Sequence, residues 1–125
     1  MNVTAKIEKV NYQVTINSEG HTIMADEPLS NNGGNKGMSP EQLLLSSLGA
    51  CIAITLRMYS LRKEWNVGNI SVNLSLETGN GLTTINKEIT YSESITEEQR
   101  TRLIQIAKSC PISKILLGEI IINTK

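Results

Sequence analysis

The two cysteines are the residues of this chain best suited to covalent chemistry. Cys51 lies within an apolar stretch, and Cys110 is followed directly by a proline. If two free thiols meet in a fold, sulfenic acid formed on one can be captured by the other as a reversible disulfide. The alternative for each is simple packing, because free cysteine is among the most buried residue types.

The segment around Cys110 predicts a helix break followed by a new helical turn. Pro111 suits the first helical position, where its missing N–H would be unpaired anyway. The amides of Ile112 and Ser113 would then lie beside the sulfur, and a helix N-terminus stabilises a thiolate, which is the reactive form.

Glu41 and His21 are further candidates for catalytic roles. Glu41 could orient a catalytic arginine or accept a proton; alternatively, it only stabilises the first turn of a helix. Ten residues of straight helix would separate Glu41 from Cys51 by ~15 Å. A shared site therefore needs Glu41 from a second chain or a bend near Gly49, which favours a dimer with composite sites. A Cys–His hydrolase using His21 lacks an identifiable third, orienting residue.

One long helix from Pro40 to about residue 62 or 63 would position Cys51. Ser39 can cap it, and Gln42 three residues later completes a capping-box pattern. Residues 43–61 leave almost no polar face, so we expect other elements or a partner chain to enclose the helix.

The flanking patterns predict an α+β fold in a single domain over residues 1–125. Before the helix, residues 4–10, 12–16 and 21–26 predict a three-stranded antiparallel sheet, followed by a flexible loop over residues 27–38. After it come strands at 70–77 and 82–94, a helix opened by the Thr96–Gln99 capping box, a short helical piece at 112–117 and a last strand at 119–124.

Composition excludes some function classes. Twelve basic residues balance twelve acidic ones, so no net positive charge favours nucleic acid or an anionic membrane. The N-terminus lacks a basic region followed by an apolar run, and the long helix carries Ser46, Ser47, Thr55 and Arg57, so it is a poor membrane span. We therefore expect a cytoplasmic protein. One histidine and two cysteines are too few for a four-ligand zinc site, and we expect no metal and no cofactor.

Three motifs in order resemble the OsmC/Ohr family, the osmotically inducible and organic hydroperoxide resistance proteins. They are residues 39–44 (Ser-Pro-Glu-Gln-Leu-Leu) leading to 48–51 (Leu-Gly-Ala-Cys), residues 110–113 (Cys-Pro-Ile-Ser), and residues 21–28 before the glycine-rich loop. The resemblance covers essentially the whole chain and agrees with the predicted order of elements.

The resemblance implies an intertwined homodimer with two active sites at its interface. It implies a peroxiredoxin-like thiol peroxidase of the oxidative stress response, with Cys51 as the peroxidatic thiol and Cys110 as the resolving thiol. Organic hydroperoxides would be the substrates and an external dithiol the reductant. Glu41, from the partner chain, would orient a catalytic arginine. The alternative is an OsmC-like protein that binds a small hydrophobic ligand without catalysis, with structural thiols.

The catalytic arginine is where the chain departs from the family pattern. The family's hydroperoxide reductases carry it in the N-terminal strands, but no arginine precedes Arg57 here, and Lys6, Lys9 and Lys36 are the lysines of that region. Lysine is a point charge that cannot form the bidentate fork of a guanidinium. The departure favours the broader OsmC-like branch over a dedicated hydroperoxide reductase, with a helix end, Lys36 or Arg57 of a partner chain stabilising the thiolate instead.

Overall fold

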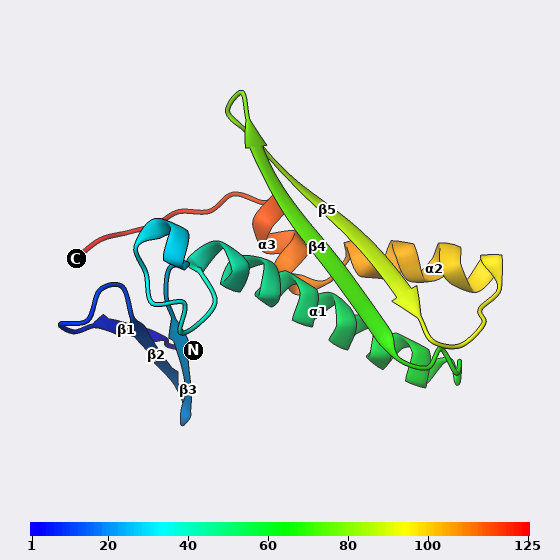
Figure 1. Ribbon diagram of the computed structural model, residues 1–125. Helices are drawn as coiled ribbons and strands as arrows, with labels where there is room; N and C mark the ends of the chain where they lie inside the picture. The colour runs from blue at the N-terminus through cyan, green and yellow to red at the C-terminus, as the bar shows by residue number, and fades with distance from the viewer. The chain divides into compact units, whose positions relative to one another are not determined.

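The computed structural model describes residues 1–125 and divides the chain into two compact units, Met1–Leu44 and Leu45–Lys125. The elements follow the predicted α+β order as far as residue 117, with three strands, a short 3-10 helix (η1, Leu29–Asn31) in the loop, a long helix, two strands and two helices (Figure 1). The assignment of 1–125 to one domain stays a prediction.

The N-terminal unit holds a three-stranded antiparallel sheet in the order β1 (Thr4–Ile7), β2 (Val14–Ser18) and β3 (His21–Ala25). The predicted meander is confirmed, although β1 ends three residues earlier than expected. The β2–β3 hairpin turns at Glu19 and Gly20, which both have positive φ angles, as the tightest hairpin turns require.

The loop after β3 is organised around one buried carboxylate. Asp26 is 1% exposed and accepts hydrogen bonds from the amides of Glu27, Gly34 and Lys36, at 2.7, 3.4 and 3.1 Å. Burial alone would raise the pKa of Asp26, but these backbone hydrogen bonds outweigh it and hold the pKa below its usual value. A side chain at Gly33 would collide with the backbone of Glu27. The buried carboxylate thus holds several amides of the loop in place. The predicted flexibility of this loop stays a prediction.

The long helix α1 (Pro40–Arg62) has the predicted start and length. The Ser39 amide donates to the Gln42 side chain at 2.9 Å, and the Gln42 amide donates back to the Ser39 hydroxyl at 3.3 Å, which confirms the capping box. At the other end, the Trp65 amide donates to the Ser60 carbonyl at 2.9 Å, and this bond closes the last turn.

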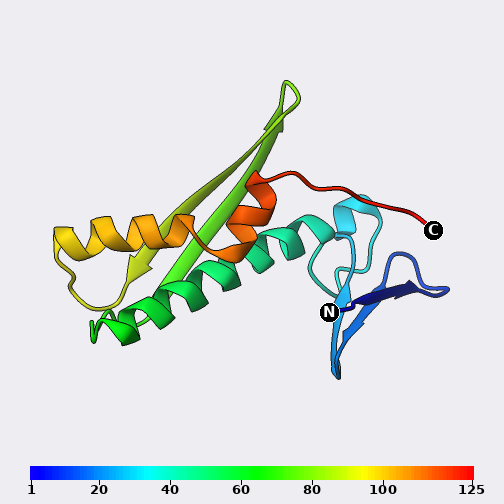
Figure 2. The ribbon, with the colours of Figure 1, turned by 180° about the vertical axis from the view of Figure 1, so that it is seen from behind.

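The C-terminal unit packs its helices on one face of a hairpin, which both ribbon views show (Figures 1 and 2). The hairpin is β4 (Ile70–Gly79) with β5 (Leu82–Tyr91), and the shorter helices are α2 (Glu97–Lys108) and α3 (Pro111–Leu117). Both ends of the Thr96–Gln99 capping box are present. Alternate residues of β4 are half-buried, as the strict alternation predicts. The buried core of this unit consists of Leu48, Ile52, Leu56, Tyr59, Val67, Leu103, Ala107 and Cys110.

The predicted last strand does not form in this chain. Residues 119–124 are extended but unpaired, and Ile120, Ile121 and Ile122 are exposed. A strand needs the hydrogen-bonding edge of a neighbouring strand, and neither sheet of the chain pairs with this segment. The strand prediction is therefore wrong for the single chain.

One flank of α1 is apolar and uncovered. Ile54, Met58 and Leu61 recur at three- and four-residue spacing and are 56%, 62% and 67% exposed. The helix is long and apolar enough to cross a membrane, a test that the core helix of a soluble protein also passes. The apolar sequence of this helix predicts that it is enclosed, but within one chain only one side of the helix is covered.

Candidate functional site: a pair of thiols in the C-terminal unit

The two cysteines meet in the C-terminal unit. Both are free thiols, and Cys51 is one of the neighbouring groups that lower the pKa of Cys110. Cys51 is partly exposed, whereas Cys110 is 0% exposed. The two residues are 59 positions apart in the sequence, and the fold places both at one buried cluster. Their pairing as a disulfide stays a prediction.

The packing of two helices accounts for this meeting. Ile52 and Leu56 of α1 and Leu103 and Ala107 of α2 belong to one buried cluster. Cys110, two residues after the end of α2, is also part of this buried cluster. Cys51 precedes Ile52 on α1 and packs against the edge of the same cluster, so its sulfur lies between the core and the surface.

Cys110 caps the helix that follows it. Its sulfur accepts a hydrogen bond from the Ser113 amide at 3.4 Å and lies 3.2 Å from the Ser113 hydroxyl oxygen. Burial raises the pKa of the Cys110 thiol, but hydrogen bonds from the Ser113 side chain and amide, from Cys51 and from the Ile112 amide outweigh it. The pKa of Cys110 therefore lies below its ordinary value, in agreement with the predicted helix start beside the sulfur.

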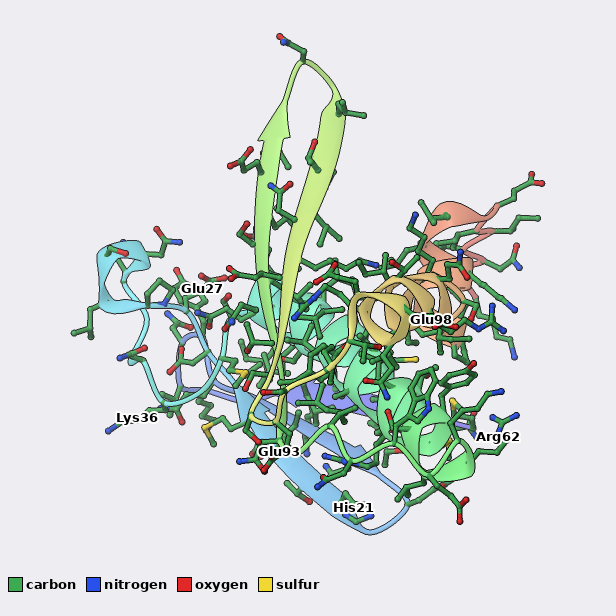
Figure 3. The ribbon with its side chains drawn as sticks, turned by 90° about the vertical axis from the view of Figure 1, so that its right-hand side faces the viewer. His21, Glu27, Lys36, Arg62, Glu93 and Glu98 are labelled. Atoms are coloured by element: carbon green, nitrogen blue, oxygen red, sulfur yellow. The ribbon has the colours of Figure 1, made fainter.

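Glu41, Lys36 and His21 belong to the N-terminal unit. Glu41 is exposed in the first turn of α1, and the helix continues without interruption past Cys51, so the two residues do not share a turn. Lys36 is exposed and extends away from its loop (Figure 3). His21 is exposed beside the β2–β3 turn and is not among the hydrogen-bond partners of Cys110. Any role of Glu41 or Lys36 beside Cys51 stays a prediction.

The arginines nearest to Cys51 in sequence interact with other groups. The Arg57 guanidinium donates to the carbonyl of Gly68, and so fastens the turn between α1 and β4. Gly68 has a φ of 70°, which favours glycine, and a side chain there would meet Ser92. Arg62 lies over the Tyr59 ring, 5.9 Å from its centroid, at the far end of α1. Within this chain, Arg57 serves the fold.

No group of three or more histidine, cysteine or acidic side chains is arranged to hold a metal ion. A cavity of about 550 Å³ lies between the end of α1 and the start of α2, with Tyr59, Trp65 and Arg102 among its lining residues. Neither cysteine lines it, so this cavity is separate from the thiol pair.

Sequence reasoning missed the Ser113 hydroxyl and the Asp26 carboxylate. The spacing of Cys110 and Ser113 matches a cap residue and its third helical position, a pattern that could have identified the contact. Asp26 had a weaker signal, a single acid before a loop rich in glycine, and its burial depends on how that loop folds back.

Comparison with known proteins supports this fold. Residues 33–125 match the family model for OsmC-like proteins. No curated protein sequence matches the chain. An osmotic stress induced and detoxification response protein of Psychrobacter arcticus is 16% identical, with a TM-score of 0.80 over 92% of this chain and 87% of that one.

Two further solved structures carry names related to hydroperoxide resistance. The organic hydroperoxide resistance protein OsmC of Legionella pneumophila is 18% identical, with a TM-score of 0.65 over 94% of this chain and 88% of that one. OhrB of Bacillus subtilis, an organic hydroperoxide resistance protein, is 22% identical, with a TM-score of 0.64 over 94% of this chain and 90% of that one. At these identities the structural likeness concerns the fold alone. The match of residues 33–125 to the family model shows that this chain belongs to the family of OsmC-like proteins.

Proposed function

We propose that this protein is a thiol-dependent peroxidase that reduces organic hydroperoxides through Cys51 and Cys110. The observation that carries the proposal is that both thiols lie at one buried cluster of the C-terminal unit, where Cys51 is close enough to lower the pKa of Cys110. Membership of the OsmC-like family, and the hydroperoxide resistance named for two structural neighbours, support the same chemistry.

The cycle has three steps. The Cys51 thiolate attacks the distal peroxide oxygen, the O–O bond breaks, and the alcohol leaves with one proton while Cys51 becomes a sulfenic acid. The Cys110 thiolate then attacks the Cys51 sulfur, and the sulfenic oxygen leaves as water after taking a proton. An external dithiol reduces the resulting disulfide by two exchange reactions and is itself oxidised.

The assignment of roles rests on the different exposure of the two thiols. Cys51 is partly exposed, whereas Cys110 is buried, so a hydroperoxide reaches the Cys51 sulfur first. Cys110 is buried with stabilising hydrogen bonds, which suits a thiol that meets only the sulfenic acid of Cys51.

The test measures consumption of cumene hydroperoxide with dithiothreitol as the reductant. We expect Cys51→Ser to abolish turnover. We expect Cys110→Ser to lose disulfide recycling and to accumulate sulfenic acid on Cys51. Ser109→Ala, an exposed change next to Cys110, is the matched control and should turn over like the wild type. Equal rates in all four proteins would overturn the proposal.

We further propose a cytoplasmic homodimer in which α1 of one chain covers α1 of the other. Exposed apolar side chains gathered on one helix face usually mark an interface. Ile54, Met58 and Leu61 form such a face, and Cys51 lies one helical turn before Ile54 on the same side. A dimer through this face would bring a second chain close to Cys51, and Glu41 of the partner subunit could then orient a cation there.

Sedimentation velocity tests the dimer. Met58→Glu places a charge in the centre of the proposed interface and should give a monomer with reduced peroxidase activity. Leu82→Glu is the matched control, because Leu82 is similarly exposed but lies at the hairpin turn between β4 and β5. A wild-type monomer, or equal behaviour of the two variants, would contradict the proposed interface.

The alternative function is a binder of small hydrophobic ligands in which the thiols only pack. The complete burial of Cys110 favours this alternative. It predicts that Cys51 reacts with iodoacetamide no faster than a free cysteine and that the native mass spectrum shows a bound small molecule. A fast reaction at Cys51 together with peroxide-dependent disulfide formation excludes it.

A further inference from the structure

The surroundings of Cys110 contain a hydroxyl group to which the thiol cycle gives no role. Ser113 is 8% exposed, and its oxygen lies 3.2 Å from the Cys110 sulfur. The Ser113 amide donates to the same sulfur at 3.4 Å. When Cys110 is a thiol it donates to this hydroxyl, and when it is a thiolate the hydroxyl donates to it.

These contacts matter because water does not reach the sulfur. Cys110 is 0% exposed, so a negative charge there is stabilised by protein donors alone. The donors are the Ser113 hydroxyl, the amides of Ser113 and Ile112, and the Cys51 thiol. In a Cys51–Cys110 disulfide the Cys51 thiol no longer exists, so three donors remain. Two of these three, the hydroxyl and the amide, belong to Ser113.

The difference in exposure also fixes the direction of disulfide reduction. Cys51 is partly exposed and Cys110 is fully buried, so an external dithiol approaches Cys51 rather than Cys110. Cys110 is therefore the leaving group. In thiol–disulfide exchange, a leaving thiol that is better stabilised as a thiolate leaves faster.

We propose that Ser113 is a positioning residue of the disulfide cycle, whose hydroxyl and amide hold the Cys110 sulfur and receive it as the departing thiolate. This inference rests on the proposed function for the cycle itself. The dithiol thiolate forms a bond to the Cys51 sulfur, the Cys51–Cys110 bond breaks, and its electron pair goes to Cys110. The second thiol of the reductant then attacks the mixed disulfide and releases Cys51.

The first test titrates Cys110 in a Cys51→Ser background, where it is the remaining cysteine. Thiolate absorbance at 240 nm gives the midpoint. Ser113→Ala should move the midpoint upward by about one pH unit, the size expected for one hydrogen bond to a charged group. Ser113→Thr and Ser113→Val have nearly equal volume, and the threonine variant alone keeps the hydroxyl. We expect the midpoint of the valine variant to lie above that of the threonine variant, while Ser109→Ala leaves it unchanged.

The second test measures how fast dithiothreitol reduces a Cys51–Cys110 disulfide formed with diamide. Ser113→Ala and Ser113→Val should react roughly three- to tenfold more slowly than the wild type and Ser113→Thr. The role of Ser113 would be overturned if the titration midpoints and the reduction rates were equal within both pairs, wild type with Ser113→Ala and Ser113→Thr with Ser113→Val. Because diamide replaces the hydroperoxide, a protein without peroxidase activity can still show the Ser113 effect, so the two proposals fail separately.

Discussion

The two units of this protein are each stabilised internally by a different kind of interaction. In the C-terminal unit, eight hydrophobic residues from α1, α2 and the segments that follow each helix form a buried cluster. In the N-terminal unit, the buried residues are Ala25 and Asp26, and the sheet leaves Ile7 and Ile23 about half exposed. One unit is organised by apolar burial, and the other by backbone hydrogen bonds to a carboxylate.

This difference shows which unit is complete by itself. Burial of large aliphatic side chains is the main favourable term in folding, and the C-terminal unit has this contribution within one chain. A three-stranded sheet without a covered apolar face is only marginally stable in water. The N-terminal unit therefore needs cover from outside itself to be stable.

The largest effect is expected in the C-terminal core. Leu103→Ala removes a side chain that is 0% exposed, and should lower the free energy of unfolding by about 2–5 kcal/mol. Ile104→Ala changes the next residue of α2, which is 48% exposed, and should cost less than about 1 kcal/mol. Urea unfolding followed by circular dichroism measures both. Similar losses at the two positions would show that α2 is buried on both faces.

An intermediate effect is expected at Asp26, and it depends on pH. Since the folded-state pKa of Asp26 lies below the ordinary value of 3.8, the unfolded chain binds the proton more readily, and the stabilisation is present above pH 3.8. It is lost as the pH falls through the folded-state pKa. Asp26→Asn should remove this acid dependence and speed hydrogen exchange at the amides of Gly34 and Lys36 at neutral pH.

Glu19→Gln, at the exposed β2–β3 turn, is the control for Asp26→Asn. It should leave the exchange of the loop amides unchanged. If Asp26→Asn exchanged at the wild-type rate, the carboxylate would not organise the loop, and the contrast between the two units would lose its basis.

The smallest effect is expected at Ser60 of α1. Its hydroxyl is buried without a hydrogen-bond partner, and an unsatisfied buried polar group destabilises a fold. Ser60→Ala should therefore raise the free energy of unfolding by up to about 1 kcal/mol, measured as a shift of the urea midpoint. A clear loss of stability would mean that the hydroxyl has a partner in the assembled protein.

Local signals predicted the helices well. Ser39 and Gln42, and Thr96 and Gln99, form the expected capping boxes, because each pattern depends on residues three apart. Pro111 likewise marked the start of α3. The predicted strand over residues 119–124 does not form, because a strand needs the edge of another strand to pair with. The composition of the segment alone does not show whether such an edge is present.

The candidate site divides in the same way. The sequence identified Cys51 and Cys110 as a pair, and the fold brings them together. It did not identify the Ser113 hydroxyl, whose contact with the sulfur depends on how α3 turns. The proposed roles of Glu41 and of a cation beside Cys51 depend on a second chain, which local sequence patterns do not encode.

One measurement tests the thiol pair most directly. The reduced protein is treated with one equivalent of cumene hydroperoxide, and non-reduced peptides of a mixture of isotopically light and heavy chains are analysed by mass spectrometry. The account predicts a disulfide between Cys51 and Cys110 of the same chain, absent from Cys51→Ser. Free thiols after treatment, or a disulfide only between different chains, would contradict it.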